Sequence, residues 1–261
     1  ELAGNNGYDL LLPIEERSVL RNKIIERREG RSGSYETIML HKKGARLSVS
    51  ISASPVFEQE QFVGVMSVIS DLTREKKQSQ LLLQLFEGLS VSSGSKFFSD
   101  VTSFFTRAFH VKYAVISIYN PEEDTARTIS FRENGKEIEN ITDKIKGTPC
   151  EITIASSRSF YGNNVAKEFP DDTWLQTAGV KSYDGRVVTD SDNNIVGLIT
   201  LLDDRPMEDD EIRNFVLDLI SARVGQEIAR YQTKEKLRKS ENLFRMLIEN
   251  SVDLNCIIDG R

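Results

Sequence analysis

The stretch from Gly147 to Asp204 constrains the fold of this chain more than any other segment. It opens with Gly-Thr-Pro-Cys-Glu, places aromatic residues at short intervals, and closes with an acidic turn and an apolar run. Residues 195–202 are almost wholly apolar, which is typical of a buried strand. The Asp- and Asn-rich segment just before them favours a hairpin turn. We therefore predict a helical, loop-rich crossover followed by a hairpin whose second strand lies in a core.

Composition places the chain among ordinary soluble globular proteins. Its 261 residues allow one large domain or two ordinary ones, and 39% of them are hydrophobic and 28% charged. No apolar run approaches the roughly 18 residues that a membrane span requires, so we expect no membrane contact within this sequence. The net charge is -6 with both signs interspersed, which argues against nucleic acid as a partner. Because the chain begins with Glu1 rather than Met, we expect a piece of a longer protein.

Neither the cysteines nor the acidic turn predicts a metal site. Cys150 and Cys256 lie far apart with no second thiol near either, so neither a disulfide framework nor a zinc site is indicated. Free thiols suit a reducing, cytoplasmic compartment. The alternate acidic and amide residues of the turn resemble the start of an EF-hand loop, but Ile195 stands where that loop requires Gly, and Leu201 where it requires an acid. The better interpretation is a hairpin turn that contains Asp190, Asp192 and Asn194.

Residues 34–71 have the pattern of an antiparallel meander preceded by a helix over residues 14–29. We expect Pro55 to end the second strand, because proline cannot donate to a strand ladder. The expected strands cover residues 34–41, 46–54 and 62–69. In the second strand, apolar residues alternate with serines, which predicts one buried face made of Leu47, Val49, Ile51 and Ala53.

This first segment resembles the C-terminal half of a PAS domain. The similarity is carried by Tyr35-Glu36-Thr37, by His41-Lys42-Lys43-Gly44, and by an exit motif with Asp71, Thr73 and Lys76. The resemblance implies that Asp71 and Thr73 couple the last strand to the outgoing helix. Either side chain can also act as an ordinary N-cap, and the two interpretations are compatible. The first strands and helices of the family have no counterpart here, so any ligand pocket in this half is expected to be incomplete.

The middle of the chain resembles a GAF domain over roughly residues 81–231. Amphipathic helices precede two strands at residues 113–119 and 127–132, Asn134-Gly135 is a strong hairpin signal, and the crossover and hairpin described above follow. Residues 240–260 resemble the opening of another PAS domain. We therefore predict an α+β chain in which antiparallel-sheet PAS-like and GAF domains are connected by long signalling helices. The predicted boundaries are 1–77 for the PAS half, 78–233 for the GAF domain, and 234–261 for a connector helix and the second PAS start.

The last long helix carries an apolar stripe that ends at Ile228 and Tyr231. Residues 232–242 are nearly all polar but contain neither Pro nor Gly, so we predict one continuous connector. An apolar stripe on a connector must be buried, and we expect the helices at 72–91 and 208–250 to pair with those of a second copy as a homodimeric coiled coil. The predicted relay residues are Asp71, Thr73, Ile228 and Tyr231.

The GAF resemblance implies a pocket lined by Cys150, Phe160, Tyr161, Trp174 and Tyr183, although such aromatic residues are more often core. Some GAF photoreceptors attach a bilin through cysteine, but Gly-Thr-Pro-Cys-Glu is widespread in ordinary GAF domains and the chain has only two histidines, which argues against a covalent bilin. GAF-type methionine sulfoxide reductases use several cysteines in one domain, whereas Cys150 lacks such a partner. No cofactor is identified, and a cyclic-nucleotide motif is not found.

These resemblances imply a sensory and relay region of a multidomain signal transduction protein, as in bacterial sensor histidine kinases or diguanylate cyclases. An unknown small molecule would bind the GAF or PAS core, and dimeric helices would carry the change to an output domain elsewhere in the parent chain. A histidine kinase of a two-component system is the first choice, by association rather than mechanism. We expect no catalytic residues in this segment. The alternative is a structural spacer and dimerisation module that binds no ligand.

Overall fold

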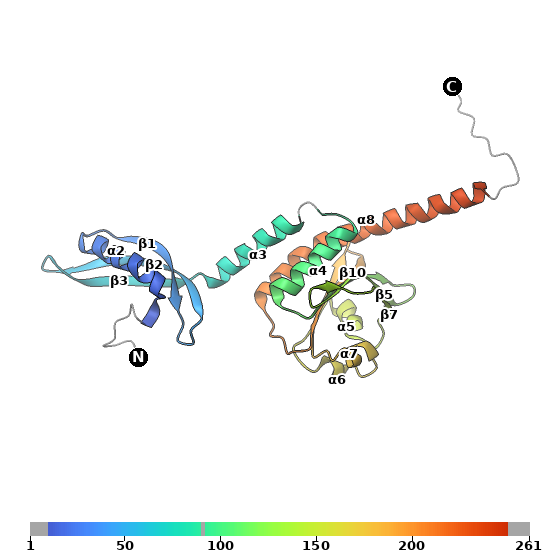
Figure 1. The fold of residues 1–261 in the computed structure, drawn as a ribbon, viewed down its shortest axis with the longest axis horizontal. Coiled ribbons are helices and arrows are strands. Elements are labelled where there is room, and N and C mark those ends of the chain that lie inside the picture. Colours follow the sequence, from blue (N-terminus) through green and yellow to red (C-terminus); the bar gives the residue numbers. More distant parts are fainter. Residues whose placement is uncertain (1–9, 90–91, 250–261) are drawn as a thin grey trace, which may run out of the picture. The chain divides into compact units, whose positions relative to one another are not determined.

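The computed structural model describes residues 10–89 and 92–249, which form two compact units. The first unit ends at Leu83 and the second begins at Gln84, so the boundary falls inside helix α3 (Thr73–Leu89). Each unit combines helices with an antiparallel sheet, as the ribbon shows (Figure 1). The predicted α+β class is therefore confirmed.

The first unit is a three-stranded sheet in the order β1-β2-β3, with a short helical segment ahead of it. The alternation in β2 buries its apolar residues on one face, where they pack with Tyr35, Met39, Leu47 and Val65. The elements are η1 (Ile14–Glu16), α2 (Arg17–Arg28), β1 (Gly33–Leu40), β2 (Arg46–Glu58) and β3 (Gln61–Asp71). The PAS resemblance of this unit stays a prediction.

Pro55 does not end the second strand, contrary to the prediction. Strand β2 continues to Glu58, and Pro55 lies opposite Val65 of β3. The pairing with β1 stops at Ala53, so from Pro55 onward β2 has a neighbour on one side only. A proline is tolerated there, because its missing N–H is not needed by a second ladder.

The end of β3 is tied to the start of α3 through the predicted exit residues. Asp71 Oδ1 accepts a hydrogen bond from the backbone N–H of Thr73 at 2.8 Å, which caps the first turn of the helix. Hydrogen bonding of the Asp71 carboxylate to the side chain and the backbone of Thr73 lowers the pKa of Asp71. Thr73 Oγ1 accepts instead from the backbone N–H of Ser48 in β2, at 3.0 Å. The two side chains thus join the helix start to both β3 and β2.

The second unit is built on a seven-stranded sheet whose main path runs β6-β5-β4-β10-β9-β8, with β7 paired to β5. Helices α4 and α8 pack on one face, and α5 packs against β8 and β9 on the other, near α6 and α7 (Figure 1). The strands are β4 (Tyr113–Asn120), β5 (Thr125–Glu133), β6 (Lys136–Glu137), β7 (Thr142–Lys144), β8 (Arg158–Tyr161), β9 (Ser182–Thr189) and β10 (Ile195–Asp203). The helices are α4 (Ser95–Phe109), α5 (Pro149–Ser156), α6 (Val165–Glu168), α7 (Thr173–Thr177) and α8 (Glu211–Glu249).

The apolar strand predicted at residues 195–202 lies in the middle of this sheet. Strand β10 is buried from Gly197 to its end, and it pairs with β4 on one side and β9 on the other. The prediction of a buried second hairpin strand is therefore confirmed. The crossover before the hairpin also supplies an edge strand, β8, which the sequence pattern did not indicate.

Helix α8 is continuous from Glu211 to Glu249, as predicted, and Asp210 caps its first turn. Its N-terminal half packs on β9 and β10, which buries Ile228 completely. Tyr231 lies edge-on to Phe98 of α4, with ring centroids 6.1 Å apart. The apolar stripe that was expected to pair with a second copy is thus buried within this chain. The PAS start predicted at residues 240–260 lies largely outside the described residues, and Cys256 lies outside them too.

The contact between α8 and β9 depends on Gly225. A Cβ atom at this position would lie 1.9 Å from the carbonyl oxygen of Thr189, which belongs to the backbone and cannot turn aside. In the interior of an ordinary helix, changing Gly to Ala stabilises the helix by up to about 1 kcal/mol. Here the helix and sheet must separate, which costs about 1–3 kcal/mol.

We therefore predict that Gly225→Ala lowers the free energy of unfolding of the second unit. Urea unfolding followed by the fluorescence of Trp174, the single tryptophan, measures that unit. The exposed residue Lys234 of the same helix provides the control, because Lys234→Ala should change stability by less than about 0.5 kcal/mol. A Gly225→Ala chain as stable as the unchanged protein would contradict the close approach.

Candidate functional site

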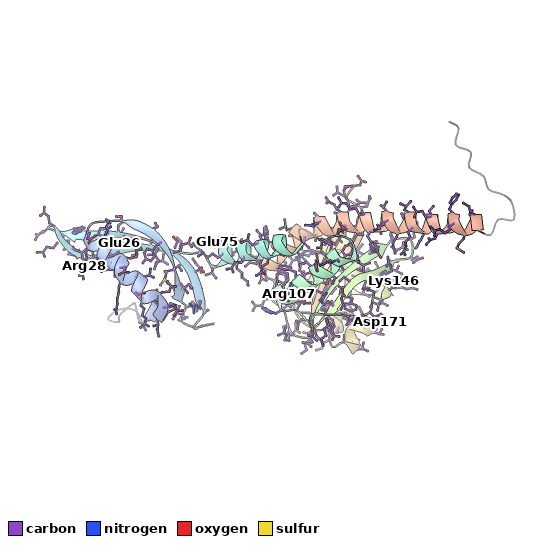
Figure 2. The ribbon with its side chains drawn as sticks, turned by 45° about the horizontal axis from the view of Figure 1, so that its top comes forward. Glu26, Arg28, Glu75, Arg107, Lys146 and Asp171 are labelled. Atoms are coloured by element: carbon purple, nitrogen blue, oxygen red, sulfur yellow. The ribbon has the colours of Figure 1, made fainter. Side chains whose placement is uncertain are left out.

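A pocket opens on the face of the second sheet that lies opposite α4 and α8. Its volume is about 310 Å³, at the lower end of the range for small-molecule sites. Lys146 and Asp171, labelled in Figure 2, are among the residues that border it. The residues that line the pocket are Val115, Ser117, Ala126, Thr128, Phe131, Ile141, Asp143, Lys144, Ile145, Lys146, Thr148, Pro149, Cys150, Asp171, Asp172, Thr173, Trp174, Leu175, Tyr183, Thr200 and Leu202.

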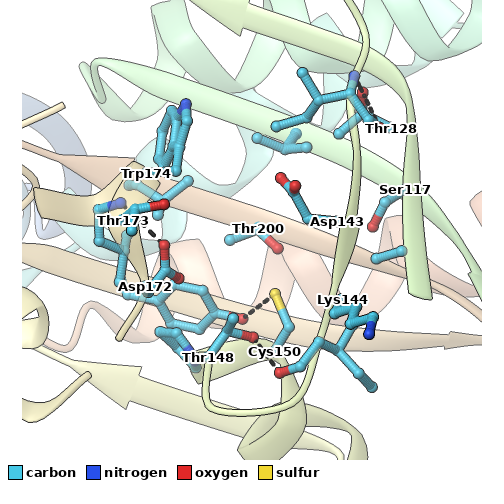
Figure 3. Close-up of a pocket in the computed structure, with 18 of the residues that line it drawn as sticks. Ser117, Thr128, Asp143, Lys144, Thr148, Cys150, Asp172, Thr173, Trp174 and Thr200 are labelled. Atoms are coloured by element: carbon cyan, nitrogen blue, oxygen red, sulfur yellow. Dashed lines mark hydrogen bonds between the residues drawn. The ribbon is translucent and has the colours of Figure 1, made fainter. Parts of the chain in front are cut away.

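The floor of the pocket carries hydroxyl groups from three neighbouring strands: Thr128 of β5, Ser117 of β4 and Thr200 of β10 (Figure 3). Thr128 Oγ1 donates to Asn140 Oδ1 at 3.0 Å and accepts from the backbone N–H of Ile141 at 2.8 Å. Ser117 is 5% exposed, and its hydroxyl has no hydrogen-bond partner within the described residues. Because this side chain lines the cavity, its hydroxyl is available to a ligand or water.

Cys150 and Tyr183 form one corner of the pocket. The Tyr183 hydroxyl lies 3.6 Å from Cys150 Sγ and 2.8 Å from Thr153 Oγ1. Gly185 makes room for this ring, because a Cβ atom there would lie 2.4 Å from the Tyr183 oxygen. Burial raises the pKa of the Cys150 thiol, and it raises the pKa of Tyr183 well above its ordinary value.

The wall beside this corner is aromatic. Trp174 packs against Tyr113 and Phe131, with ring centroids 5.1 and 5.5 Å away. Tyr113 and Phe131 come from β4 and β5, whereas Trp174 comes from α7, so the three rings hold the crossover against the sheet. Edge-on and tilted ring pairs of this kind stabilise beyond their buried area.

Charged side chains surround the mouth. Asp172 is half-buried, and its carboxylate caps α7 by accepting the backbone N–H of Leu175 at 3.0 Å. Burial raises the pKa of Asp172, the capping bond opposes this, and the nearby Asp143 carboxylate raises the pKa further. Lys144 and Lys146 border the same mouth and are exposed to solvent.

Of the predicted pocket residues, the structure brings Cys150, Trp174 and Tyr183 together in the lining. Tyr161 does not line the pocket and packs behind it, 6.2 Å from Tyr183 between ring centroids. Phe160 lies on the opposite face of the sheet, because consecutive residues of β8 alternate between faces. Ligand contact by Cys150, Trp174 and Tyr183 stays a prediction, since no ligand is bound.

The sequence analysis did not identify the floor hydroxyls or the carboxylates at the mouth. Ser117 and Thr200 are each a single small hydroxyl residue within an otherwise apolar run of a strand. That departure from the apolar pattern could have identified them as pocket residues. Asp172 stands just before Thr173-Trp174, which is a typical N-cap position. Asp143 carries no such signal, because its place depends on how β7 pairs with β5.

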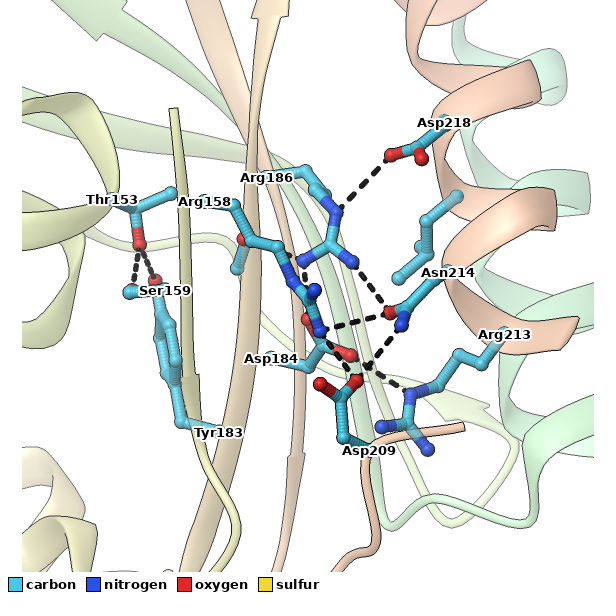
Figure 4. Close-up of polar contacts among 12 residues, drawn as sticks. Thr153, Arg158, Ser159, Tyr183, Asp184, Arg186, Asp209, Arg213, Asn214 and Asp218 are labelled. Atoms are coloured by element: carbon cyan, nitrogen blue, oxygen red, sulfur yellow. Dashed lines mark hydrogen bonds and ion pairs between the residues drawn. The ribbon is translucent and has the colours of Figure 1, made fainter. Parts of the chain in front are cut away.

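Behind the sheet, a buried ionic network joins β9 to α8 (Figure 4). Asp184 is fully buried, and its two carboxylate oxygens accept hydrogen bonds from Arg186 at 2.5 Å and from Arg213 at 2.8 Å. Arg186 belongs to β9 and Arg213 to the first turn of α8. Arg186 also donates to Asn214 of α8, at 2.6 Å. The start of α8 is therefore fixed to β9 by charge-assisted hydrogen bonds.

The edge strand β8 adds to the same network. Arg158 of β8 donates to Asp209 at 2.5 Å and to Asn214 at 3.1 Å. Phe160 is the next residue on that face of β8. The centroid of its ring lies 5.9 Å from Arg158 Cζ and 5.6 Å from Arg213 Cζ, within the range of cation–π contacts. This is the environment of the residue that was predicted to line the pocket.

The arrangement is suited to binding a small polar molecule. Burial raises the pKa of Cys150, the opposite of what an activated nucleophilic cysteine requires. In the part of the chain that the structure describes, no group of three or more His, Cys, Asp or Glu could hold a metal ion. The same residues include no helix long and apolar enough to cross a membrane.

A curated protein with a similar sequence is hybrid signal transduction histidine kinase F of Dictyostelium discoideum. It is 25% identical over 182 residues, which cover 69% of this chain and 15% of the kinase. The chain therefore spans a small part of that relative. No model of a known protein family matches the sequence.

Solved structures with the same fold include the GAF domain of a phosphoenolpyruvate-protein phosphotransferase from Coxiella burnetii. The alignment covers 62% of this chain and 98% of that domain, with a TM-score of 0.52 and 9% sequence identity. A second structure is that of free methionine-R-sulfoxide reductase from Neisseria meningitidis in complex with its substrate. The alignment covers 60% of this chain and 91% of the reductase chain, with a TM-score of 0.50 and 11% sequence identity. Because the first unit ends at Leu83, alignments that cover about 60% of the chain are too long for the first unit alone and include much of the second. The second unit therefore has a GAF-type fold.

Proposed function

We propose that this chain is the sensory and relay region of a larger signal transduction protein. The observation that carries the proposal is the pocket on one face of β9 and the ionic network to α8 on the other face of the same strand. The similarity to a hybrid histidine kinase supports a signalling context, and a histidine kinase output is the first choice. The proposed role is binding and relay, with no reaction catalysed by these residues.

The relay runs through neighbouring residues of β9. Tyr183 faces the pocket, and Asp184 faces α8, where it binds Arg213. A ligand that displaces the Tyr183 ring must move the β9 backbone, and that backbone carries the carboxylate to which α8 is fixed. The ligand can shift the equilibrium between two positions of α8 only if it binds one of them more tightly than the other. The difference in affinity sets the size of the shift.

The exposed side of α8 offers the contact for a second copy. Positions on this side recur in alternating steps of four and three, the spacing of a coiled-coil seam. The large apolar members are exposed, with 47% of Leu219 and 60% of Leu243 accessible. The series is Phe215, Leu219, Ala222, Gln226, Ala229, Thr233, Lys236, Ser240, Leu243 and Leu247. We propose that the chain dimerises along this seam rather than through Ile228.

Ligand binding is tested with the whole chain and a broad panel of small metabolites. We expect at least one compound to raise the melting temperature and to slow amide exchange at residues 182–189 and 211–220. The first effect follows from binding to the native state, and the second from the link between β9 and α8. If no compound alters either readout, the structural spacer is the better account. A compound that stabilises without changing exchange in α8 would contradict the relay.

The ionic network is tested by comparing Asp184→Ala with Asp218→Ala. Removing Asp184 leaves two buried guanidinium groups without their carboxylate, so we expect a loss of about 3–5 kcal/mol in the unfolding free energy. Asp218 also pairs with Arg186, at 3.3 Å, but its side chain is 69% exposed, so its removal should cost at most about 1 kcal/mol. Urea unfolding followed by Trp174 fluorescence distinguishes them. Equal losses would contradict the special role of Asp184.

The seam is tested by light scattering on the double variant Leu219→Glu, Leu243→Glu. We expect the unchanged chain to have the mass of two copies and the double variant to have the mass of one, because four carboxylates would meet along the seam. The control is Arg238→Glu, an exposed position of α8 outside the series, which should leave the mass unchanged. A double variant that stays dimeric would exclude this seam.

A further inference from the structure

Most charged side chains at the mouth of the pocket are exposed, Asp143 and Asp171 among them. The lysines Lys144 and Lys146 are exposed, so their ammonium groups keep their hydration. Asp172 is half-buried, and the carboxylate of Asp143 is near enough to repel its negative charge. Within residues 10–89 and 92–249, neither carboxylate has an ion-pair partner. The most interior charge of the empty pocket is therefore negative and unneutralised.

The neighbouring surface is aromatic. Trp174 follows Asp172 by two residues, and its indole ring lines the pocket (Figure 3). Phe131, on the sheet below, supports that ring at 5.5 Å. Carboxylates beside an indole ring form the combination that favours an organic cation, because the ring face attracts positive charge and the carboxylates neutralise it.

The floor adds an independent sign that the pocket is made for a polar ligand. Ser117 is 5% exposed, lines the cavity, and has no hydrogen-bond partner in the described part of the chain. A hydroxyl in an apolar strand would be disfavoured if it faced only protein carbon. Its position opposite Thr128 leaves it facing the cavity.

We propose that this pocket binds a small organic ammonium ion, held by the carboxylates of Asp143 and Asp172 beside the indole ring of Trp174. The proposal rests on the proposed sensing function and names the chemical class of its ligand. The volume of about 310 Å³ restricts that ligand to a small amine or amino-acid-like molecule. Filling the site neutralises the two neighbouring carboxylates, which gives the ligand-bound form an electrostatic advantage over the empty one.

The test uses matched probes that differ in charge while keeping their carbon skeleton. Benzylamine, benzyl alcohol and benzoate form one set, and butylamine, butanol and butyrate form a second. Each is titrated into the whole chain while the fluorescence of Trp174, the single tryptophan, is followed. We expect the amine of at least one set to bind about tenfold or more tightly than its neutral and anionic counterparts.

Variants assign the effect to the two carboxylates. Asp143→Asn and Asp172→Asn should each weaken amine binding about tenfold. Asparagine is as good an N-cap as aspartate, so Asp172→Asn keeps the start of α7 intact. Asp192→Asn is the control, because it makes the same charge change at an exposed turn outside the pocket lining and should leave amine binding unchanged.

The outcomes separate this proposal from the sensing function on which it rests. If benzoate, butyrate or an anionic metabolite binds at Trp174 while both amines fail, the ammonium assignment is wrong and the sensing function stands. Amine binding that survives both Asp143→Asn and Asp172→Asn also overturns the assignment. If neither the probes nor the metabolite panel changes Trp174 fluorescence or the melting temperature, the sensing function fails and this proposal fails with it.

Discussion

The burial of strand β10 is the constraint on which the second unit depends. Its residues are apolar on both faces, so each face of the sheet must be covered by other elements. The N-terminal half of α8, together with α4, covers one face, and the crossover covers the other. The helical cover is close, as the absence of a side chain at Gly225 permits. The crossover covers the other face of the sheet incompletely, and the pocket is the space between the crossover and the sheet.

Strand β9 connects these two covers because neighbouring residues point to opposite faces. Tyr183 enters the pocket wall, whereas Asp184 is buried between two arginines under α8. A buried carboxylate with two guanidinium partners is stable only while the partners keep their geometry. A shift of β9 by a fraction of a hydrogen-bond length is therefore opposed strongly on the α8 side. In the relay that we propose, this stiffness is what would carry a change in the pocket to the helix.

The sequence was most informative where local pattern decides the structure. The apolar run of β10, the alternation in β2 and the uninterrupted length of α8 were all predicted, because burial and helix continuity follow directly from residue spacing. Pro55 was misjudged, because its tolerance depends on where β1 stops pairing. Phe160 was assigned to the pocket although the alternation of a short edge strand, itself not foreseen, turns it away.

The apolar stripe that contains Ile228 shows why helix periodicity alone does not identify a partner. Spacing indicates that a face must be buried, but it does not distinguish a sheet in the same chain from a second helix. Here the sheet occupies that face, with Ile228 packed over Gly197 of β10. The opposite side of α8 then becomes the available one, and it keeps its seven-residue spacing well past the last contact with the sheet. In the function that we propose, one helix therefore has separate faces for the sheet and for a second copy, so a tilt imposed by β9 on the first face would be carried to the second along the continuous helix α8.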